Sequence, residues 1–230
     1  MRNSRGIFVL IGMTFFSFLG TASAGQFGAP EPAAASRYIS VGGGYFYNSD
    51  TWKFGSKSQD YKFTQNQIYL QFGAAHQNIE FYIRVGAADF KLGNAFPNGD
   101  FTDNYKPFGT MGVKGFIEIN SYVGIGLFAQ GSIFSSYKSQ SVEIKDLNEV
   151  DFGLMLQGKI NRICVYAGPF LYATHAKAEP TTTGSDSFNQ SNNFGGVAGI
   201  RIPISKGINF EVEGQYRQEF SAGGAITYSF

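Results

Sequence analysis

Residues 208–218 have the sequence INFEVEGQYRQ, in which two kinds of side chain alternate. Every second residue from Ile208 to Tyr216 is apolar, aromatic or Gly, and the residues between them, from Asn209 to Arg217, are polar or charged. In a strand, successive side chains point to opposite faces, whereas a helix would mix the two sets. The stretch therefore predicts a β-strand with one apolar and one polar face.

The same period of two recurs along most of the chain after residue 36. In residues 66–76, for example, Ile68, Leu70 and Phe72 share one face. The sequence therefore predicts an all-β, antiparallel fold of ten strands. Pro169 lies inside one of these segments and predicts a bulge there, because Pro cannot donate to the ladder; an eight-stranded fold stays open as the alternative. The ten segments are residues 37–47, 66–76, 79–90, 108–119, 121–134, 149–160, 162–174, 193–204, 208–218 and 221–230.

The connections between these segments alternate between short and long. Four are short, and four are long and polar, before a final short connection near residues 219–221. Short turns on the periplasmic side and long loops outside are typical of outer-membrane β-barrels. The short connections are 76–78, 120–121, 161–162 and 205–207, and the long ones are about 49–65, 92–107, 135–148 and 175–192.

A soluble barrel or sandwich also has one apolar and one polar face, so composition must decide between the two. Charged residues are 15% of the chain, against about 25% in soluble domains. The polar faces hold much Gly, Tyr and Ser, as a narrow lumen does. Aromatic residues lie near strand ends on the apolar face, as in the girdles of membrane barrels: Tyr45, Tyr47, Phe194, Tyr228 and Phe230. The balance favours a closed transmembrane β-barrel.

The first residues predict export. Arg2 and Arg5 precede an apolar stretch at residues 7–20, and Ala22 and Ala24 flank Ser23 in a small-residue cleavage site. Residues 1–24 are therefore predicted to be a signal peptide, with an uncleaved N-terminal anchor as the alternative. Residues 25–36 are rich in Pro, Ala and Gly and are expected to be a flexible periplasmic segment, and residues 37–230 are expected to form the barrel.

These features together resemble a known family. The signal peptide, the rhythm of short turns and long loops, and the final residues ITYSF (226–230) are similar to the small outer-membrane β-barrel, or surface-antigen, proteins of Gram-negative bacteria. The resemblance implies location in the outer membrane, with membrane lipid and the barrel assembly machinery as partners. It also implies that Tyr228 and Phe230 form the signal that this machinery recognises.

Ten charged residues fall on the predicted lumen face, five of each sign. Buried charges need partners, so we expect these residues to pair and largely plug the lumen. Arg84, Lys114 and Glu213 are expected near mid-barrel, where they could pair across it. The alternative is a narrow channel for ions or small solutes. The set is Glu80, Arg84, Lys114, Glu118, Asp151, Lys159, Arg201, Glu211, Glu213 and Arg217.

Residues suited to catalysis or metal binding are scarce. The only histidines are His76, in a predicted turn, and His175, at the start of a long loop. A triad of His175 with Asp89 or Glu149 stays open by spacing alone, so an outer-membrane lipid or peptide hydrolase is a third hypothesis. Cys164 stands alone, so no disulfide within the chain and no cysteine-based metal site is expected.

The predicted function is therefore a non-enzymatic structural or surface-interaction protein. No catalytic residues, cofactor or metal are assigned. The near-neutral charge gives no indication of nucleic-acid binding. A monomer is expected, and an extracellular ligand of the loops stays open.

Overall fold

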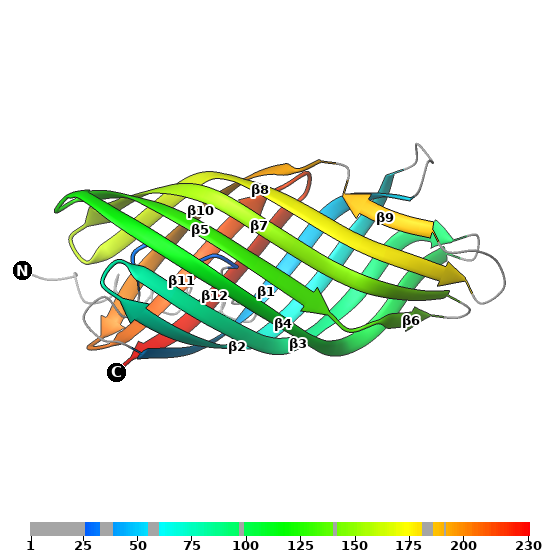
Figure 1. The fold of residues 1–230 in the computed structure, drawn as a ribbon, viewed down its shortest axis with the longest axis horizontal. Helices are drawn as coiled ribbons and strands as arrows, with labels where there is room; N and C mark the ends of the chain where they lie inside the picture. The colour runs from blue at the N-terminus through cyan, green and yellow to red at the C-terminus, as the bar shows by residue number, and fades with distance from the viewer. Residues whose placement is uncertain are drawn as a thin grey trace, which may run out of the picture.

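In the part of the chain that the structure describes, twelve β-strands form one antiparallel sheet that closes on itself (Figure 1). The structure is a computed structural model that describes residues 26–32, 39–54, 60–96, 99–139, 142–180, 186–190 and 192–230. Within those ranges, no helix is long and apolar enough to cross a bilayer. The strands are β1 (Ile39–Phe54), β2 (Asp60–His76), β3 (Ile79–Phe96), β4 (Gly99–Asn120), β5 (Val123–Phe134), β6 (Tyr137–Ser139), β7 (Val142–Ile160), β8 (Ile163–Pro180), β9 (Asp186–Gln190), β10 (Phe194–Ser205), β11 (Ile208–Tyr216) and β12 (Phe220–Ser229).

Ten of these strands make a closed barrel, in the order β1-β2-β3-β4-β5-β7-β8-β10-β11-β12 among the described residues. Closure comes from β12, which pairs antiparallel with β1 from Ser40 opposite Ser229 to Tyr47 opposite Ala222. Closure gives both end strands a hydrogen-bonding neighbour on each side. This is required in a bilayer, because lipid cannot form hydrogen bonds with the backbone groups of an open edge. The prediction of a ten-stranded membrane barrel is confirmed, and the eight-stranded alternative is not needed.

The short turns lie where the sequence predicts them. They join β2 to β3, β4 to β5, β7 to β8 and β10 to β11, and they share one end of the barrel with the C-terminus (Figure 1). Gln77, Asn161 and Gly207 adopt positive φ in these turns, at 54°, 57° and 84°. We call this end periplasmic and the opposite end outer.

The strands continue further toward the outer end than predicted. The sequence predicts this strand only from residue 66, whereas β2 begins at Asp60. Likewise, β3 runs to Phe96 and β4 begins at Gly99. Much of the sequence predicted as long loops is therefore strand. The two-residue period does continue there, but the apolar residues move from the outward face to the inward face. A strand predicted from one continuous apolar face therefore ends too early.

The barrel consequently has two stacked regions. We call the periplasmic part, where apolar side chains point outward, the membrane tier. We call the other part the outer tier. There β10, β11 and β12 have ended, and the short β9 bridges β8 and β1 through the pairs His175–Asn189 and Trp52–Gln190. The outer tier comprises residues 49–54, 60–66, 89–96, 99–106, 137–139, 142–148, 175–180 and 186–190.

The bulge predicted at Pro169 is wrong. The register of β7 and β8 is the same on both sides of it, with Gly153 opposite Phe170 and Leu156 opposite Ala167. Pro169 is exposed on the outward face. A missing N–H leaves out a ladder bond without requiring an extra residue, so the strand continues without a bulge.

Candidate functional site

Residues 26–32 lie inside the barrel, although the sequence predicted a flexible periplasmic segment for residues 25–36. Gln26 is 5% exposed and Phe27 and Ala29 are fully buried. In Figure 1 this short segment runs within the ring of strands. Pro and Gly correctly indicated irregular backbone, but the lumen provides partners for its polar groups, which a composition argument does not detect. We call residues 26–32 the plug.

Glu213 of β11 binds the start of the plug. Its carboxylate accepts hydrogen bonds from three successive backbone N–H groups, those of Gln26 at 2.8 Å, Phe27 at 3.1 Å and Gly28 at 2.8 Å. Gly28 has a φ of +73°, and a Cβ there would meet Glu211 Oε2 at 2.7 Å. Glycine is therefore required where the plug turns around the carboxylate.

The basic residues of the lumen bind the backbone carbonyls of the plug. Arg84 donates to the carbonyl of Gln26, and Lys114 donates to that of Ala29 at 3.3 Å. Arg201 donates to the carbonyls of Ala29 at 3.3 Å and Glu31 at 2.6 Å. Each of these is a charge-assisted bond to a backbone carbonyl, so the plug is held along its length.

Apolar contacts fix the side chains of the plug. The ring of Phe27 stacks on Phe128 at 4.1 Å between centroids and meets Phe170 edge-on at 5.0 Å. Pro30 lies against the backbone of β5, where a Cβ added to Gly126 would come within 1.9 Å of it. The wall and the plug therefore fit with no room for a further methyl group at Gly126.

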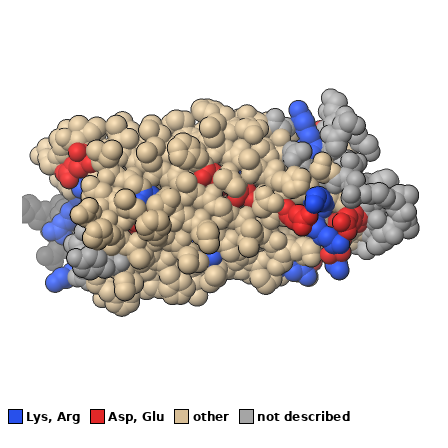
Figure 2. Space-filling model, in the orientation of Figure 1, with Lys and Arg blue, Asp and Glu red and all other residues tan. Residues whose placement is uncertain are grey.

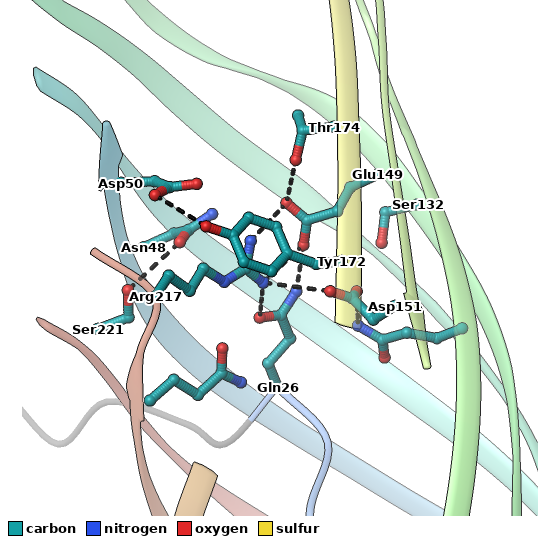
Figure 3. Close-up of polar contacts among 12 residues, drawn as sticks. Gln26, Asn48, Asp50, Ser132, Glu149, Asp151, Tyr172, Thr174, Arg217 and Ser221 are labelled. Atoms are coloured by element: carbon teal, nitrogen blue, oxygen red, sulfur yellow. Dashed lines mark hydrogen bonds and ion pairs between the residues drawn. The ribbon is translucent and has the colours of Figure 1, made fainter. Parts of the chain in front are cut away.

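Arg217 forms the centre of a buried polar cluster above the plug (Figure 3). Its guanidinium donates to both oxygens of Glu149, each at 2.8 Å, and to Asp151 at 3.3 Å. It also donates to the side chain of Gln26 at 3.1 Å and lies 4.5 Å from the ring centre of Tyr172. The first residue of the plug is thus part of this cluster.

Two acids in this cluster were not among the predicted lumen residues. Glu149 has the same strand parity as Asp151, so the alternation that found Asp151 could have found it. Asp50 fell in a predicted loop at 49–65, but it lies on β1, where its carboxylate accepts a hydrogen bond from Tyr172 at 3.2 Å. Both acids point into the lumen in Figure 3.

The structure places most of the predicted charge set inside the barrel. The ion pairs are Lys114 with Glu80 at 3.7 Å and Arg201 with Glu211, besides those of Arg217. Lys159 is partly exposed and binds Glu31 of the plug at 2.9 Å, and Glu118 is exposed near a turn. The buried members of the set are Glu80, Arg84, Lys114, Asp151, Arg201, Glu211, Glu213 and Arg217.

The expected pairing of Arg84 and Lys114 with Glu213 across the lumen is replaced by contacts with the plug. Each of the three binds its backbone, the bases through carbonyls and the acid through N–H groups. Arg84 also donates to Gln71 at 2.7 Å. The pattern of alternation contains no information about residues 26–29, which are the partners of these three side chains.

The outer tier is filled by an aromatic core instead of charges. Trp52 stacks on Phe63 at 4.3 Å, and Phe90 contacts Phe101 at 5.5 Å and Tyr137 at 4.9 Å. These residues come from β1 to β4 and from β6, and the core also includes residues of β7 and β8, so it crosses the lumen. The core comprises Trp52, Tyr61, Phe63, Phe90, Leu92, Phe101, Tyr137, Ile144, Leu147, Ala176 and Ala178.

The outside of the outer tier carries charges, which gather at that end in Figure 2 while the middle of the molecule shows few. Lys145 pairs with Glu179 at 2.6 Å and Lys177 with Asp146 at 2.8 Å. The hydrogen bond from Lys177 lowers the pKa of Asp146. This surface is suited to water, whereas that of the membrane tier is suited to lipid.

Glu149 and His175 lie one register step apart on β7 and β8, but Glu149 is buried in the lumen and His175 is partly exposed on the other face. His76 is exposed at the end of β2, and His175 lies on β8 opposite Asn148. Asp89 accepts two hydrogen bonds from Asn66, at 2.5 and 2.7 Å, and Glu149 binds Arg217. Both candidate acids for a triad are therefore engaged elsewhere.

Cys164 and the acidic residues are the other groups that could carry thiol or metal chemistry. Cys164 is buried and has no disulfide partner among the described residues. In the same part of the chain, no three His, Cys, Asp or Glu side chains are grouped to hold a metal ion.

Tyr228 and Phe230, the predicted assembly signal, both lie exposed at the periplasmic end. Their rings are 4.8 Å apart, and the N–H of Phe230 donates to the carbonyl of Ile39 at 3.0 Å. Both rings are accessible on the outward face of the barrel wall, and their role as a signal stays a prediction. Ala22 and Ala24, the predicted cleavage residues, lie outside the described residues.

Comparisons with known proteins agree with this architecture. Similar solved structures include an outer membrane channel from Pseudomonas putida F1, with 10% identity, a TM-score of 0.52 and coverage of 91% of this chain and 100% of that chain. They also include the transport unit of the autotransporter AIDA-I from Escherichia coli, with 12% identity, a TM-score of 0.53 and coverage of 84% and 90%. At such identities the likeness shows the fold alone.

No curated protein matches the chain. The model of one family, described as the outer membrane protein beta-barrel domain, matches residues 68–229, which is more than half of the chain. The protein therefore belongs to the outer membrane protein beta-barrel domain family and resides in the outer membrane.

Proposed function

We propose that the protein is a non-enzymatic barrel whose lumen is closed, and whose outer tier serves as a rigid platform with a structural or surface-interaction role. The observation that supports this proposal is the packing of side chains inside the barrel at two levels. The plug fills the membrane tier and the aromatic core fills the outer tier. Residues of the chain itself occupy the lumen at both levels.

Closure in the membrane tier rests on satisfied polar groups. An ion crosses a barrel only where water keeps it hydrated or where fixed dipoles take the place of its hydration shell. Here the charged side chains bind the plug or one another, and Arg84, Glu213 and Arg217 are each at most 4% exposed. Both signs of charge are present, whereas a selective pore favours a ring of one sign.

Closure in the outer tier rests on apolar packing. Trp52, Phe63 and Phe90 are at most 2% exposed, and their rings are in mutual contact. An ion would have to cross this layer without water, at a cost that excludes steady conduction. The same packing makes the outer tier rigid, which suits a platform that presents a charged surface outside the membrane.

The test is electrical. Purified protein in a planar bilayer should show no steady current. Deleting residues 26–32 should leave the aromatic core closed, and the double change Trp52→Ala with Phe90→Ala should leave the plug closed. Only the combination of both should conduct. Phe152→Ala with Leu154→Ala, two changes on the lipid face, serves as a matched control that should stay silent.

The narrow channel is the alternative that this experiment decides. Stable unitary currents from the unaltered protein would overturn the closed lumen. Currents after deletion of residues 26–32 alone would show that the aromatic core does not close the barrel, and would leave the plug as the single closure.

A further inference from the structure

The wall of the barrel holds the plug mainly through the backbone of the plug. Glu213 accepts three successive N–H groups, and Gln157 accepts a fourth, that of Glu31, at 3.0 Å. Basic side chains of the wall bind three of the backbone carbonyls. Each residue other than Pro carries one N–H and one C=O, so the same bonds are open to a segment of another chain.

The plug lies inside the wall without being part of it. Among the described residues, none of the strand pairings includes residues 26–32. Side chains of the wall make the contacts instead, from Arg84, 58 positions away from Gln26, to Arg217, 191 positions away. The barrel therefore binds the plug as it would bind a separate peptide.

Two positions of the plug make the site selective. The ring of Phe27 lies in a slot between Phe128 and Phe170, with ring centres 4.1 and 5.0 Å away. At Gly28 the backbone has a φ of +73°, and a Cβ would come within 2.7 Å of Glu211 Oε2. The site therefore accepts an aromatic residue followed by glycine.

The site is reached from the periplasmic end. Lys159, next to the turn between β7 and β8, pairs with Glu31 at 2.9 Å, and these side chains are 33% and 25% exposed. At the other end of the plug, Gln26 is 5% exposed and binds the buried guanidinium of Arg217. A segment that replaces the plug therefore enters from the periplasm.

We propose that the lumen is a peptide-binding site for an extended segment with an aromatic residue followed by glycine, and that the plug occupies it as an intramolecular ligand. A periplasmic peptide of the same chemistry displaces the plug once its concentration exceeds the effective concentration of a segment tethered in the same chain, on the order of millimolar. The proposal goes beyond the closed lumen, because closure needs only a plug in place. Exchange opens no path, since the aromatic core stays where it is.

The first experiment frees the site in an otherwise unaltered chain. Gly28→Val should release the plug, because valine fits neither the positive φ nor the contact with Glu211. Hydrogen exchange of the N–H groups of residues 26–28 should then be at least about tenfold faster than in the wild type. A dye-labelled peptide QFGAPEP, blocked at both ends, should bind this variant at least about tenfold more tightly than the wild type, as measured by fluorescence anisotropy in detergent, since the wild-type site is occupied.

Two controls test where and how the peptide binds. Adding Glu213→Gln to the Gly28→Val chain should weaken binding about tenfold, because the N–H groups lose a charged acceptor. Adding Glu118→Gln instead, at an exposed acid near a turn, is the matched control and should leave binding unchanged. The peptide QFVAPEP, which lacks the glycine, should bind at least about tenfold more weakly than QFGAPEP.

The wild-type chain provides a second measurement that does not depend on the folding of a variant. Unlabelled QFGAPEP at about 10 mM, above the effective concentration of the plug, should speed hydrogen exchange of residues 26–28, whereas QFVAPEP should not. Mass spectrometry separates the blocked peptide from the chain. An unchanged exchange rate in the wild type would overturn the proposal, as would a Gly28→Val plug that stays protected or a released plug with no peptide binding. An electrically silent barrel that binds no peptide would refute this inference and leave the closed lumen standing.

Discussion

The two halves of β2 show opposite arrangements within one strand. From Gln67 to Ala74 the outward residues are apolar, and the inward ones include Gln67 and Gln71. From Asp60 to Asn66 the outward residues are polar or charged, and the inward ones include Tyr61 and Phe63. Backbone direction and pairing do not change between the halves, so the environment outside the strand decides which chemistry belongs inside.

The physical reason lies in the solvent of each half. Lipid accepts apolar side chains on the outside of the membrane tier, so polar residues and the plug occupy the lumen. Water surrounds the outer tier, so the hydrophobic effect drives its aromatic residues inward, as in a soluble domain. The barrel therefore combines a membrane protein and a soluble core on one set of strands.

The strongest test of the membrane tier is Arg217→Met. Methionine leaves Glu149 and Asp151 buried without their cation, and the free energy of unfolding should fall by about 3–5 kcal/mol. Urea titration of protein refolded in lipid vesicles measures this. Lys159→Met is the control, because its ion pair with Glu31 is partly exposed and should matter far less. If both variants lost the same free energy of unfolding, burial would not determine how much an ion pair contributes to stability.

Reversing the outward chemistry should also discriminate the tiers. Leu154 is 46% exposed on the lipid face. Leu154→Arg places a charge in lipid and should lower the free energy of unfolding by about 2–4 kcal/mol. Asp60→Arg, on the outward face of the outer tier, should change stability by no more than about 0.5 kcal/mol. The same vesicle titration measures both variants. If Asp60→Arg cost more stability than Leu154→Arg, the membrane would surround the outer tier instead of the membrane tier.

The outer core should respond to small losses of volume as a soluble core does. Ile144→Val removes a methylene from a fully buried position and should cost about 0.5–1.5 kcal/mol. Ile133→Val, at a position 70% exposed, should have almost no effect. If both variants unfold at the wild-type urea concentration, the outer tier is loosely packed and the comparison with a soluble core fails.

The smallest effect on stability is expected at the C-terminus. Deleting Phe230 removes an exposed ring and one backbone hydrogen bond, so refolding of purified protein into detergent should change little. Assembly in cells should fall clearly if Tyr228 and Phe230 form the assembly signal. Quantifying folded barrel in isolated outer membranes tests this, with Ile39→Ala, an exposed neighbour on β1, as control. Wild-type levels of the deletion variant would remove the signal role.

The sequence alone determined the strands of the membrane tier. Their alternation, their short turns and their lipid face follow from local order, since neighbouring residues on a strand point to opposite sides regardless of what lies across the barrel. The predicted strand ends at the periplasmic turns agree with the structure within two residues. The same local order found eight of the buried lumen charges.

Only the tertiary structure decided what these charges bind and how the outer end closes. Gln26 and Glu213 are 187 positions apart, and β9 joins β8 to β1 across most of the chain. No local period encodes such contacts, because they depend on which residues the closed ring brings to the same depth. The Pro-rich segment 26–32 has no periodicity of its own, so its place in the lumen comes entirely from the side chains that surround it.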